Sequence, residues 1–439
     1  MNRTDVGFRH KVRQKVLAAI DDQADELIRF LQEYVSHKSV NPGRGSPDDP
    51  GEEATCQQWL AGRLSQFSVF DKVDLWEEAA GRPNLAVVLG GSSGQAGLMF
   101  NGHTDTVEVT ASQRSEWQGD PWSGEIRGGK LFGRGATDMK AGNAAFLWAA
   151  KVLGESKVPL AANVVLTCSI GEETAEAEIG PMSVIRRGYT APLVVNAEPT
   201  NMAVAPATMG WFFFRISVIG KALHPASRFT AIYPSTAPLP LPGVDAIDKM
   251  RRIMQALSDL ERDWGLYQKH PLMAPGSMNV CPVYIRGGNY RASMSEACEV
   301  IYAVPYSPGL RSAQVIQQIK EAVDGVVRTD TWLREHPPSY EIPVIHQILE
   351  PVNLPPDHPD VQAVAAAYRE ALDAQPEVRG MPGPCDANIM NEAGLTTVIF
   401  GPGDLSMNAH GTNEYVPVQH VIDACKVYAS LMIDRCADN

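Results

Sequence analysis

The sequence predicts an α/β protein in which a central mixed sheet is flanked by helices and a smaller α+β segment is inserted. Apolar runs of strand length alternate with amphipathic helical stretches in the first half of the chain, which is typical of α/β domains. The pattern changes near Met209, where the aromatic and β-branched run WFFFRISVI begins a second group of elements. We therefore expect a discontinuous catalytic domain over residues 1–206 and 331–439, and a separate domain over residues 207–330.

The chain has 439 residues, which is long enough for two or three domains. Its net charge is −13, from 38 Lys and Arg against 51 Asp and Glu, which argues against nucleic acid or an anionic membrane as a partner. The seven cysteines are odd in number and form no CxxC pair, which favours a reducing compartment without a disulfide framework. No apolar run has the length of a signal-peptide core or a membrane span, so we expect a cytoplasmic protein.

Each expected element of the catalytic domain follows from its periodicity and from the turn residues around it. The Pro- and Gly-rich stretch 39–51 and the polar stretch 111–130 are expected to be loops. The expected helices cover residues 10–36, 51–66, 141–153, 360–374 and 417–433. The expected strands cover residues 71–77, 84–89, 98–100, 163–169, 193–196 and 397–400.

The inserted domain has its own pattern, a β-α-β-β-α order that could form a small sheet with helices on one face. A proline-rich loop over residues 225–242 precedes its first helix. The expected strands cover residues 211–219, 277–285 and 297–304, and the expected helices cover residues 244–264 and 313–327.

Polar residues follow the buried strand that begins at Leu98. Asn101 and Gly102 are expected to end this strand, and His103 and Asp105 come next. Residues two apart in an extended chain point the same way, so one of these side chains can bind a metal ion while the other supports it. The alternative is a histidine that is merely satisfied at a strand end.

Five possible metal ligands lie at strand ends or at glycine-flanked turns, where distant segments of an α/β sheet can converge. Two histidines and three carboxylates are too many for one tetrahedral zinc ion. They suit two divalent ions about 3.5–4 Å apart with one bridging carboxylate. The ligands are His103, Asp138, Glu173, Glu198 and His410.

Glu172 and Glu173 are adjacent, so they are not expected to bind the same ion. We assign Glu173 to the metal and Glu172 to general base catalysis, in which a carboxylate moves a proton from water to the leaving group. Asp138 is the candidate bridge because the glycines around it permit tight turns. The alternatives are a solvated acidic loop at the GEE sequence and an ordinary helix start after Asp138.

Five motifs occur in the order found in a known family. They are FNGHTDTV, GRGATDMKAG, GEE, NAEPT and NAHGTNE. As a set they resemble the dinuclear zinc metallopeptidases and deacylases, which include acetylornithine deacetylase, succinyl-diaminopimelate desuccinylase, aminoacylases and glutamate carboxypeptidases. The similarity extends over nearly the whole chain.

The resemblance implies how the ligands are divided. One ion would take His103 and Glu198, the other would take Glu173 and His410, and Asp138 would bridge them. Asp105 would orient His103, and Glu172 would be the base. The family often has a cis peptide after the bridging aspartate, which is here the bond between Asp138 and Met139.

The inserted segment resembles the lid or dimerisation domain of the family, which implies a homodimer. His224, in the sequence GKALH, matches a histidine that reaches the partner's active site and supports the oxyanion in dimeric relatives. The arginine that commonly binds a substrate carboxylate is absent from the strand at 299–306. Arg291 could replace it, and Arg286 competes for that role. The loop over residues 229–242 is also longer than in the family.

These observations predict a metal-dependent hydrolase of a C–N bond in a small molecule. The expected reaction is deacylation of an N-acyl amino acid by a metal-activated water, with zinc as the expected metal and manganese or cobalt as alternatives. The nearest alternatives are a dipeptidase or carboxypeptidase, and a hydrolytic deaminase of an unusual amine such as an aromatic one. More distant alternatives are a metal-dependent binding protein without catalysis and an interaction module that acts only through its dimerisation domain.

Overall fold

The computed structural model describes residues 3–42, 51–232, 241–344 and 347–438, and the chain forms two compact units. Unit 1 comprises Met1–Ala207, Val352–Met381 and Cys385–Asn439, and unit 2 comprises Thr208–Pro351 and Pro382–Pro384. The sequence places the end of the second domain at residue 330, whereas unit 2 extends to Pro351. The extension joins unit 2 because its β11 (Ser339–Glu341) pairs with β8 (Gly210–Ile219).

Unit 1 is built on a six-stranded mixed sheet in the order β1-β2-β6-β3-β7-β12. The first two strands are antiparallel to their neighbours, while β6, β3, β7 and β12 run parallel. The expected α/β fold with a mixed central sheet is thereby confirmed. The strands are β1 (Lys72–Ala79), β2 (Arg82–Leu89), β3 (Ala96–His103), β6 (Asn163–Ser169), β7 (Leu193–Asn196) and β12 (Thr396–Ile399).

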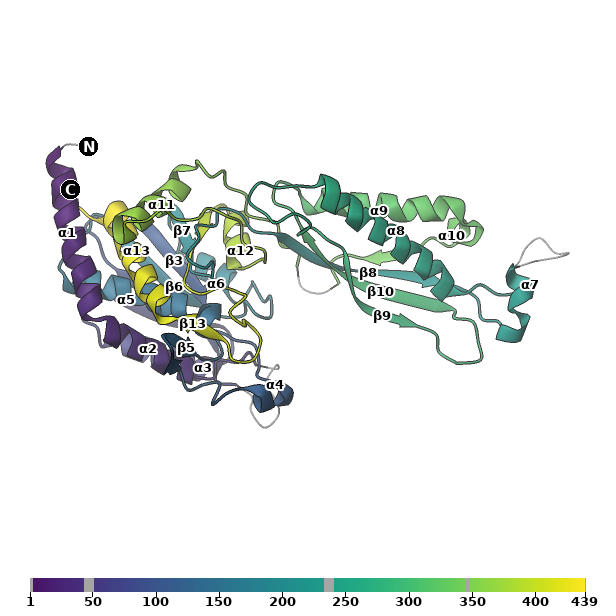
Figure 1. Ribbon diagram of the computed structural model, residues 1–439, viewed down its shortest axis with the longest axis horizontal. Coiled ribbons are helices and arrows are strands. Elements are labelled where there is room, and N and C mark those ends of the chain that lie inside the picture. The colour runs from purple at the N-terminus through teal and green to yellow at the C-terminus, as the bar shows by residue number, and fades with distance from the viewer. Residues whose placement is uncertain (1–2, 43–50, 233–240, 345–346, 439) are drawn as a thin grey trace. The chain divides into compact units, whose positions relative to one another are not determined.

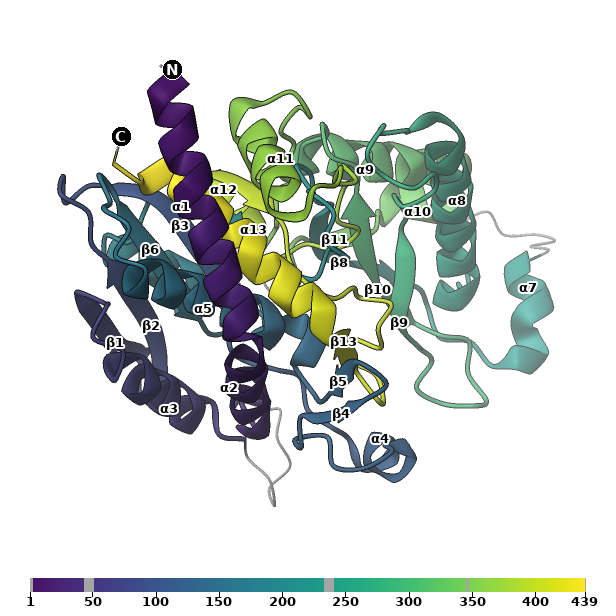
Figure 2. The ribbon, with the colours of Figure 1, turned by 60° about the vertical axis from the view of Figure 1, so that its left-hand side comes forward.

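Helices cover both faces of this sheet. The larger group packs its apolar side chains on one face, and α5 and α13 cross the sheet there (Figure 2). Its members are α1 (Arg3–Asp22), α2 (Ala24–Ser36), α3 (Glu53–Ser65), α5 (Ala141–Glu155), α11 (Pro359–Leu372) and α13 (Val418–Cys436). The opposite face carries the short helices α6 (Pro181–Arg186) and α12 (Asp386–Glu392).

The expected single helix over residues 10–36 was wrong, because α1 and α2 are separated at Gln23. This residue has non-helical backbone angles, with φ −101° and ψ 11°. Its side chain donates to Glu155 and accepts a hydrogen bond from Lys151, both at the end of α5. Tertiary bonds to α5 therefore hold the break that periodicity alone did not reveal.

The stretch 111–130, expected as a loop, contains α4 (Ala111–Glu116) and β4 (Glu125–Arg127). A capping box at Thr110 starts α4. The strand β4 belongs to a small antiparallel sheet in the order β13-β5-β4, with β5 (Lys130–Phe132) and β13 (Tyr415–Pro417). Pairing of β13 with β5 joins two distant segments of the chain, which sequence patterns do not indicate.

Unit 2 is an antiparallel four-stranded sheet in the order β11-β8-β10-β9, with two long helices packed on one face (Figure 1). The added elements are α7 (Arg228–Ile232), α8 (Ala246–Tyr267), β9 (Cys281–Gly287), β10 (Ala297–Tyr306), α9 (Ser312–Thr329) and α10 (Thr331–Glu335). The strand expected over residues 277–285 begins only at Cys281, because Met278 and Val280 enter the core outside the sheet. Alternation along β8 buries every second side chain against the helices.

Parts of two expected loops, residues 43–50 and 233–240, lie outside the described residues. Of the long loop expected over 229–242, the first residues belong to α7. Among the described helices, none has the length and apolar character needed to cross a membrane.

Candidate metal centre

His103 is the last residue of β3, and the strand continues through the expected break. Asn101 stays in the sheet although it is fully buried, because its amide nitrogen donates to Asn196 and Asp386 while Thr167 donates to its oxygen. The expectation that Asn101 and Gly102 end the strand was therefore wrong. Buried hydrogen bonds satisfy the polar side chain within the sheet.

Asp138 lies in a tight turn over Ala136–Lys140, immediately before α5. The preceding Gly135 has a φ of 80°, a left-handed conformation that glycine adopts easily. The peptide bond between Asp138 and Met139 is cis, as the resemblance implied. The turn presents the Asp138 carboxylate to two histidines.

The two oxygens of Asp138 face different histidine rings. Its Oδ1 lies 3.1 Å from Nε2 of His103, and its Oδ2 lies 3.3 Å from Nε2 of His410. Glu173 lies on the same side as His410, with Oε2 at 3.0 Å from that ring nitrogen. Ligand atoms of His103, Asp138 and Glu173 all lie within 4.8 Å of one another, which is a spacing that can hold a metal ion.

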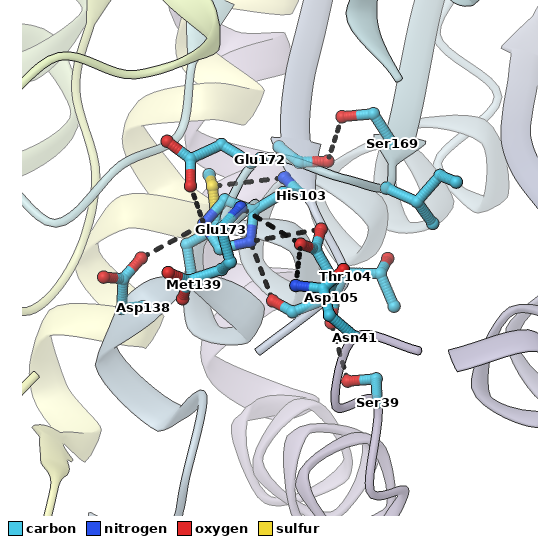
Figure 3. A network of polar contacts seen from close by, with 12 residues as sticks. Ser39, Asn41, His103, Thr104, Asp105, Asp138, Met139, Ser169, Glu172 and Glu173 are labelled. Atoms are coloured by element: carbon cyan, nitrogen blue, oxygen red, sulfur yellow. Dashed lines mark hydrogen bonds and ion pairs between the residues drawn. The ribbon is translucent and has the colours of Figure 1, made fainter. Parts of the chain in front are cut away.

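Glu172 and Glu198 complete the group around His103. Each places a carboxylate oxygen 3.9 Å from Nε2 of His103 (Glu172 is shown in Figure 3). They follow β6 and β7, whose carboxyl ends lie at the same edge of the sheet as the end of β3. The five expected ligands and Glu172 thus come together in unit 1.

Burial and mutual repulsion shift the titration of these groups. Burial raises the pKa of Glu198 and of Glu172 well above the usual range, and neighbouring carboxylates add to the effect. Contacts with Asp138 and then Glu173 raise the pKa of His410 to about 11. For His103, burial favours the neutral ring, but the surrounding carboxylates outweigh it and raise the pKa well above 6.5. These groups hold protons more strongly than usual because carboxylates are crowded together, and a bound cation would take the place of those protons.

Asp105 supports His103 mainly through its backbone. Nδ1 of His103 lies 2.9 Å from the carbonyl oxygen of Asp105 and 3.8 Å from the carboxylate. The carboxylate accepts hydrogen bonds from Nδ2 of Asn41 and from the backbone N–H of Glu173 (Figure 3). The Asp105 carboxylate therefore ties the His103 strand end to the Glu173 turn.

The remaining expected site residues, His224 and Arg291, belong to unit 2. Both have exposed side chains. Nδ1 of His224 accepts a hydrogen bond from the backbone of Ala226. Arg291 lies in the turn that follows β9.

Sequence reasoning missed three buried polar residues that hold the ligands. Asn41 binds Asp105, and Asp386 accepts hydrogen bonds from Asn101 and Ser169 beside the cluster. Glu414 accepts hydrogen bonds from the backbone of the Asp138 turn. Glu414 stands within the NAHGTNE motif, four residues after His410, which was the one available signal.

Histidines and carboxylates gathered at the carboxyl edge of an α/β sheet define a metal-dependent hydrolase of the amidohydrolase type. The profile described as Peptidase family M20/M25/M40 matches residues 99–434. The chain belongs to this family.

Named relatives cover almost the whole chain. It is 29% identical over 429 residues to N-formyl-4-amino-5-aminomethyl-2-methylpyrimidine deformylase of Bacillus subtilis, covering 95% of this chain and 96% of that protein. It is 24% identical to acetylornithine deacetylase of Aliivibrio salmonicida, covering 94% and 99%. A dinuclear metal-binding peptidase of family M20 from Bacillus subtilis shares the fold, with a TM-score of 0.64, 12% identity and coverage of 94% and 98%.

Proposed function

We propose that the chain hydrolyses an N-acyl amine at a pair of divalent metal ions. His103 and Glu198 would hold one ion, Glu173 and His410 would hold the other, and Asp138 would bind both. The observation that carries this assignment is the position of the Asp138 carboxylate, whose two oxygens face the two histidines separately. A bridging carboxylate needs this orientation.

The residues present fit a bound cation. Oε1 of Glu198 is buried and has no hydrogen-bond partner among the described residues, although it points toward His103. A buried carboxylate oxygen without a donor is costly, and a cation would remove that cost. Imidazole and carboxylate ligands suit zinc, manganese and cobalt, and we propose zinc.

When bound, the two ions would polarise the acyl carbonyl and lower the pKa of a water molecule. Glu172 would accept a proton at its carboxylate and deliver it to the amine that leaves. Its side chain is only 20% exposed, and burial raises its pKa, which favours a group that holds a proton near neutral pH. Asp105 would keep His103 in position through the contact to Nδ1.

For the substrate, we propose a formylated amine on a heteroaromatic ring, with an N-acyl amino acid as the second candidate. The Bacillus subtilis deformylase supports the first, because over a similar length it is 29% identical to this chain while the Aliivibrio salmonicida acetylornithine deacetylase is 24% identical. The strand β10 also supports it: the side chains at Glu299, Ile301 and Ala303 alternate with those buried under the helices, and none is an arginine that could bind a substrate carboxylate. Arg291 stays the proposed anchor for any anionic group.

We also propose that the chain forms a homodimer through unit 2, in which His224 would support the oxyanion of the partner subunit. An exposed edge strand supports this assembly, because every residue of β9 is exposed. The exposure of His224 leaves its ring available to another chain.

A substrate panel tests the proposed function. Metal-reconstituted protein would be assayed with an N-formyl aminomethylpyrimidine, N-acetylornithine, N-succinyl-diaminopimelate and a set of free-amine dipeptides. We expect the highest kcat/KM on the formyl compound and loss of turnover after chelation. Preference for dipeptides would refute the proposed substrate class, and turnover that survives removal of all metal would refute the proposed metal chemistry.

A further inference from the structure

The loop that carries His410 is conformationally strained. Asn408, His410 and Asn413 all have left-handed backbones, with φ of 61°, 60° and 56°. Such angles are uncommon for residues other than glycine, and they persist only where the surroundings hold them. The His410 side chain is 52% exposed and contacts Asp138 and Glu173 only through its ring nitrogen. Bonds to the backbone of the loop add to that restraint.

Arg134 provides one such bond from the buried interior. Its guanidinium is 1% exposed and donates from Nη2 to the carbonyl oxygen of Gly411, next to His410. From Nη1 it donates to Oε2 of Glu414 at 2.6 Å. The guanidinium carbon lies over the ring of Trp117, 5.5 Å from the ring centroid.

Glu414 extends this contact to the Asp138 turn. Its second oxygen, Oε1, accepts hydrogen bonds from the backbone N–H groups of Thr137 at 3.0 Å and of Asp138 at 3.2 Å. The carboxylate is completely buried. One ion pair therefore connects the backbone of the Asp138 turn with the backbone beside His410.

A second connection runs from the segment around α4. Nε2 of Gln113 donates to the carbonyl oxygen of His410 at 2.8 Å. The backbone N–H of Gln118 donates to Oδ1 of Asn413 at 2.7 Å. These bonds reach the loop from its exposed side, while Arg134 reaches it from the interior.

We propose that Arg134 and Glu414 are positioning residues that set the spacing between Asp138 and His410. They thereby control occupancy of the second metal position, which is the one that Glu173 and His410 would hold. The inference rests on the proposed metal pair. Removing Arg134 would release the strained loop while leaving His103 and Glu198, which follow β3 and β7, in place. The two metal equivalents should therefore respond differently to the same substitution.

Zinc binding to metal-free protein tests this, with a competing chelator to measure each equivalent. We expect the wild-type chain to bind two equivalents. Arg134→Met should bind the first zinc equivalent with unchanged affinity and the second about 10–100-fold more weakly. This is the usual effect of losing a residue that holds a metal ligand in place. Glu414→Gln should show the same selective loss, because a neutral amide holds Arg134 less tightly.

The matched control is Arg13→Met. Arg13 is also a buried arginine of unit 1, and it forms ion pairs with Glu370 and Asp434 near the C-terminal helix. It should lower thermal stability without changing either zinc affinity. Gln113→Ala, on the exposed side, provides a milder variant in case Arg134→Met does not fold, and it should weaken only the second equivalent.

The measurement separates failure of the metal pair from failure of the positioning role. If the wild-type chain binds fewer than two equivalents, the proposed metal pair is wrong and this inference is wrong with it. If the wild-type chain binds two equivalents and both Arg134→Met and Gln113→Ala bind them with unchanged affinities, the metal pair stands and the positioning role is refuted. Equal weakening of both equivalents would also refute the selective role.

Discussion

Asn41 donates a hydrogen bond from Nδ2 to the carboxylate of Asp105 at 2.8 Å, and both side chains are buried. Oδ1 of Asn41 accepts in turn from Arg82, which is paired with Glu53. A chain of buried polar contacts thus runs from the start of α3 to the residue beside His103. Asp105, at one end of this chain of contacts, supports the proposed metal ligands without contacting a substrate.

Asn41→Ala should therefore lower both stability and turnover. The substitution leaves the Asp105 carboxylate and an Arg82 donor with one hydrogen-bond partner fewer. This loss should lower the free energy of unfolding by about 1–3 kcal/mol. The kcat should fall roughly 10–100-fold with little change in KM, because the loss acts through His103 and the Glu173 turn. Denaturant unfolding and steady-state kinetics measure the two effects. The control is Asn163→Ala, at the end of β6 that is remote from the metal cluster, which should reduce stability without changing kcat. Equal kcat values for both variants would contradict the proposed role of Asn41.

Glu172→Gln should separate catalysis from metal binding. The amide cannot accept a proton, so kcat should fall about 10²–10⁴-fold while the metal content stays at two equivalents. Glu173→Gln is the matched comparison and should lose metal, because its carboxylate contacts His410. Elemental analysis and kinetics would be run on the same preparations. Full turnover by a metal-loaded Glu172→Gln chain would refute the base assignment.

Metal binding should release protons at pH 7. In the metal-free chain, contacts with Asp138 and Glu173 raise the pKa of His410 to about 11, and burial raises the pKa of Glu198. A divalent ion needs the neutral ring and the ionised carboxylate, so protons compete with it and affinity should rise with pH until the pKa of His410, about 11, is passed. Calorimetry in two buffers of different ionisation enthalpy measures the release. His410→Ala should release fewer protons, and identical heats in both buffers would count against the ligand set.

Gly142→Ala should destabilise unit 1 although it removes a glycine from a helix. A methyl group at this position in α5 would lie 2.1 Å from the carbonyl oxygen of Ala197, which precedes Glu198. The overpacking cost of about 1–3 kcal/mol should exceed the helix gain of roughly 1 kcal/mol. Gly62→Ala in α3 meets nothing within 4 Å and should be neutral or stabilising. Thermal unfolding of both variants checks the difference, and a stabilised Gly142→Ala would contradict the close contact.

Ile285→Lys should convert the proposed dimer into a monomer. Ile285 is 57% exposed on β9, which is an edge strand of its sheet among the residues that the structure describes, and a lysine there opposes edge pairing. Ile126→Lys, on the edge strand β4 of unit 1, is the matched control and should leave the assembly unchanged. Sedimentation velocity at micromolar concentration distinguishes the states. A monomeric wild-type chain would remove both the dimer and the role of His224 in a partner.

The expected strands of unit 1 were all found, because continuous apolar runs between turn residues are a local signal. Errors occurred where long-range contacts override local pattern. Gln23 breaks a periodic helix through bonds to α5, and Asn101 stays in a strand because buried partners satisfy it. Unit 2 ends at Pro351 and not at the expected residue 330 for the same reason, since β11 is a strand only by pairing with β8.

The sequence by itself determined the fold class and the identity of the grouped side chains, because strand ends and glycine-flanked turns mark the carboxyl edge of an α/β sheet. It indicated the family through the resemblance of five motifs in order. Only the tertiary structure decided how these side chains meet. It directs the two oxygens of Asp138 to different histidines and joins the Asp138 turn to Glu414, 276 residues away in the chain. Such contacts depend on packing between distant segments, which no local pattern encodes.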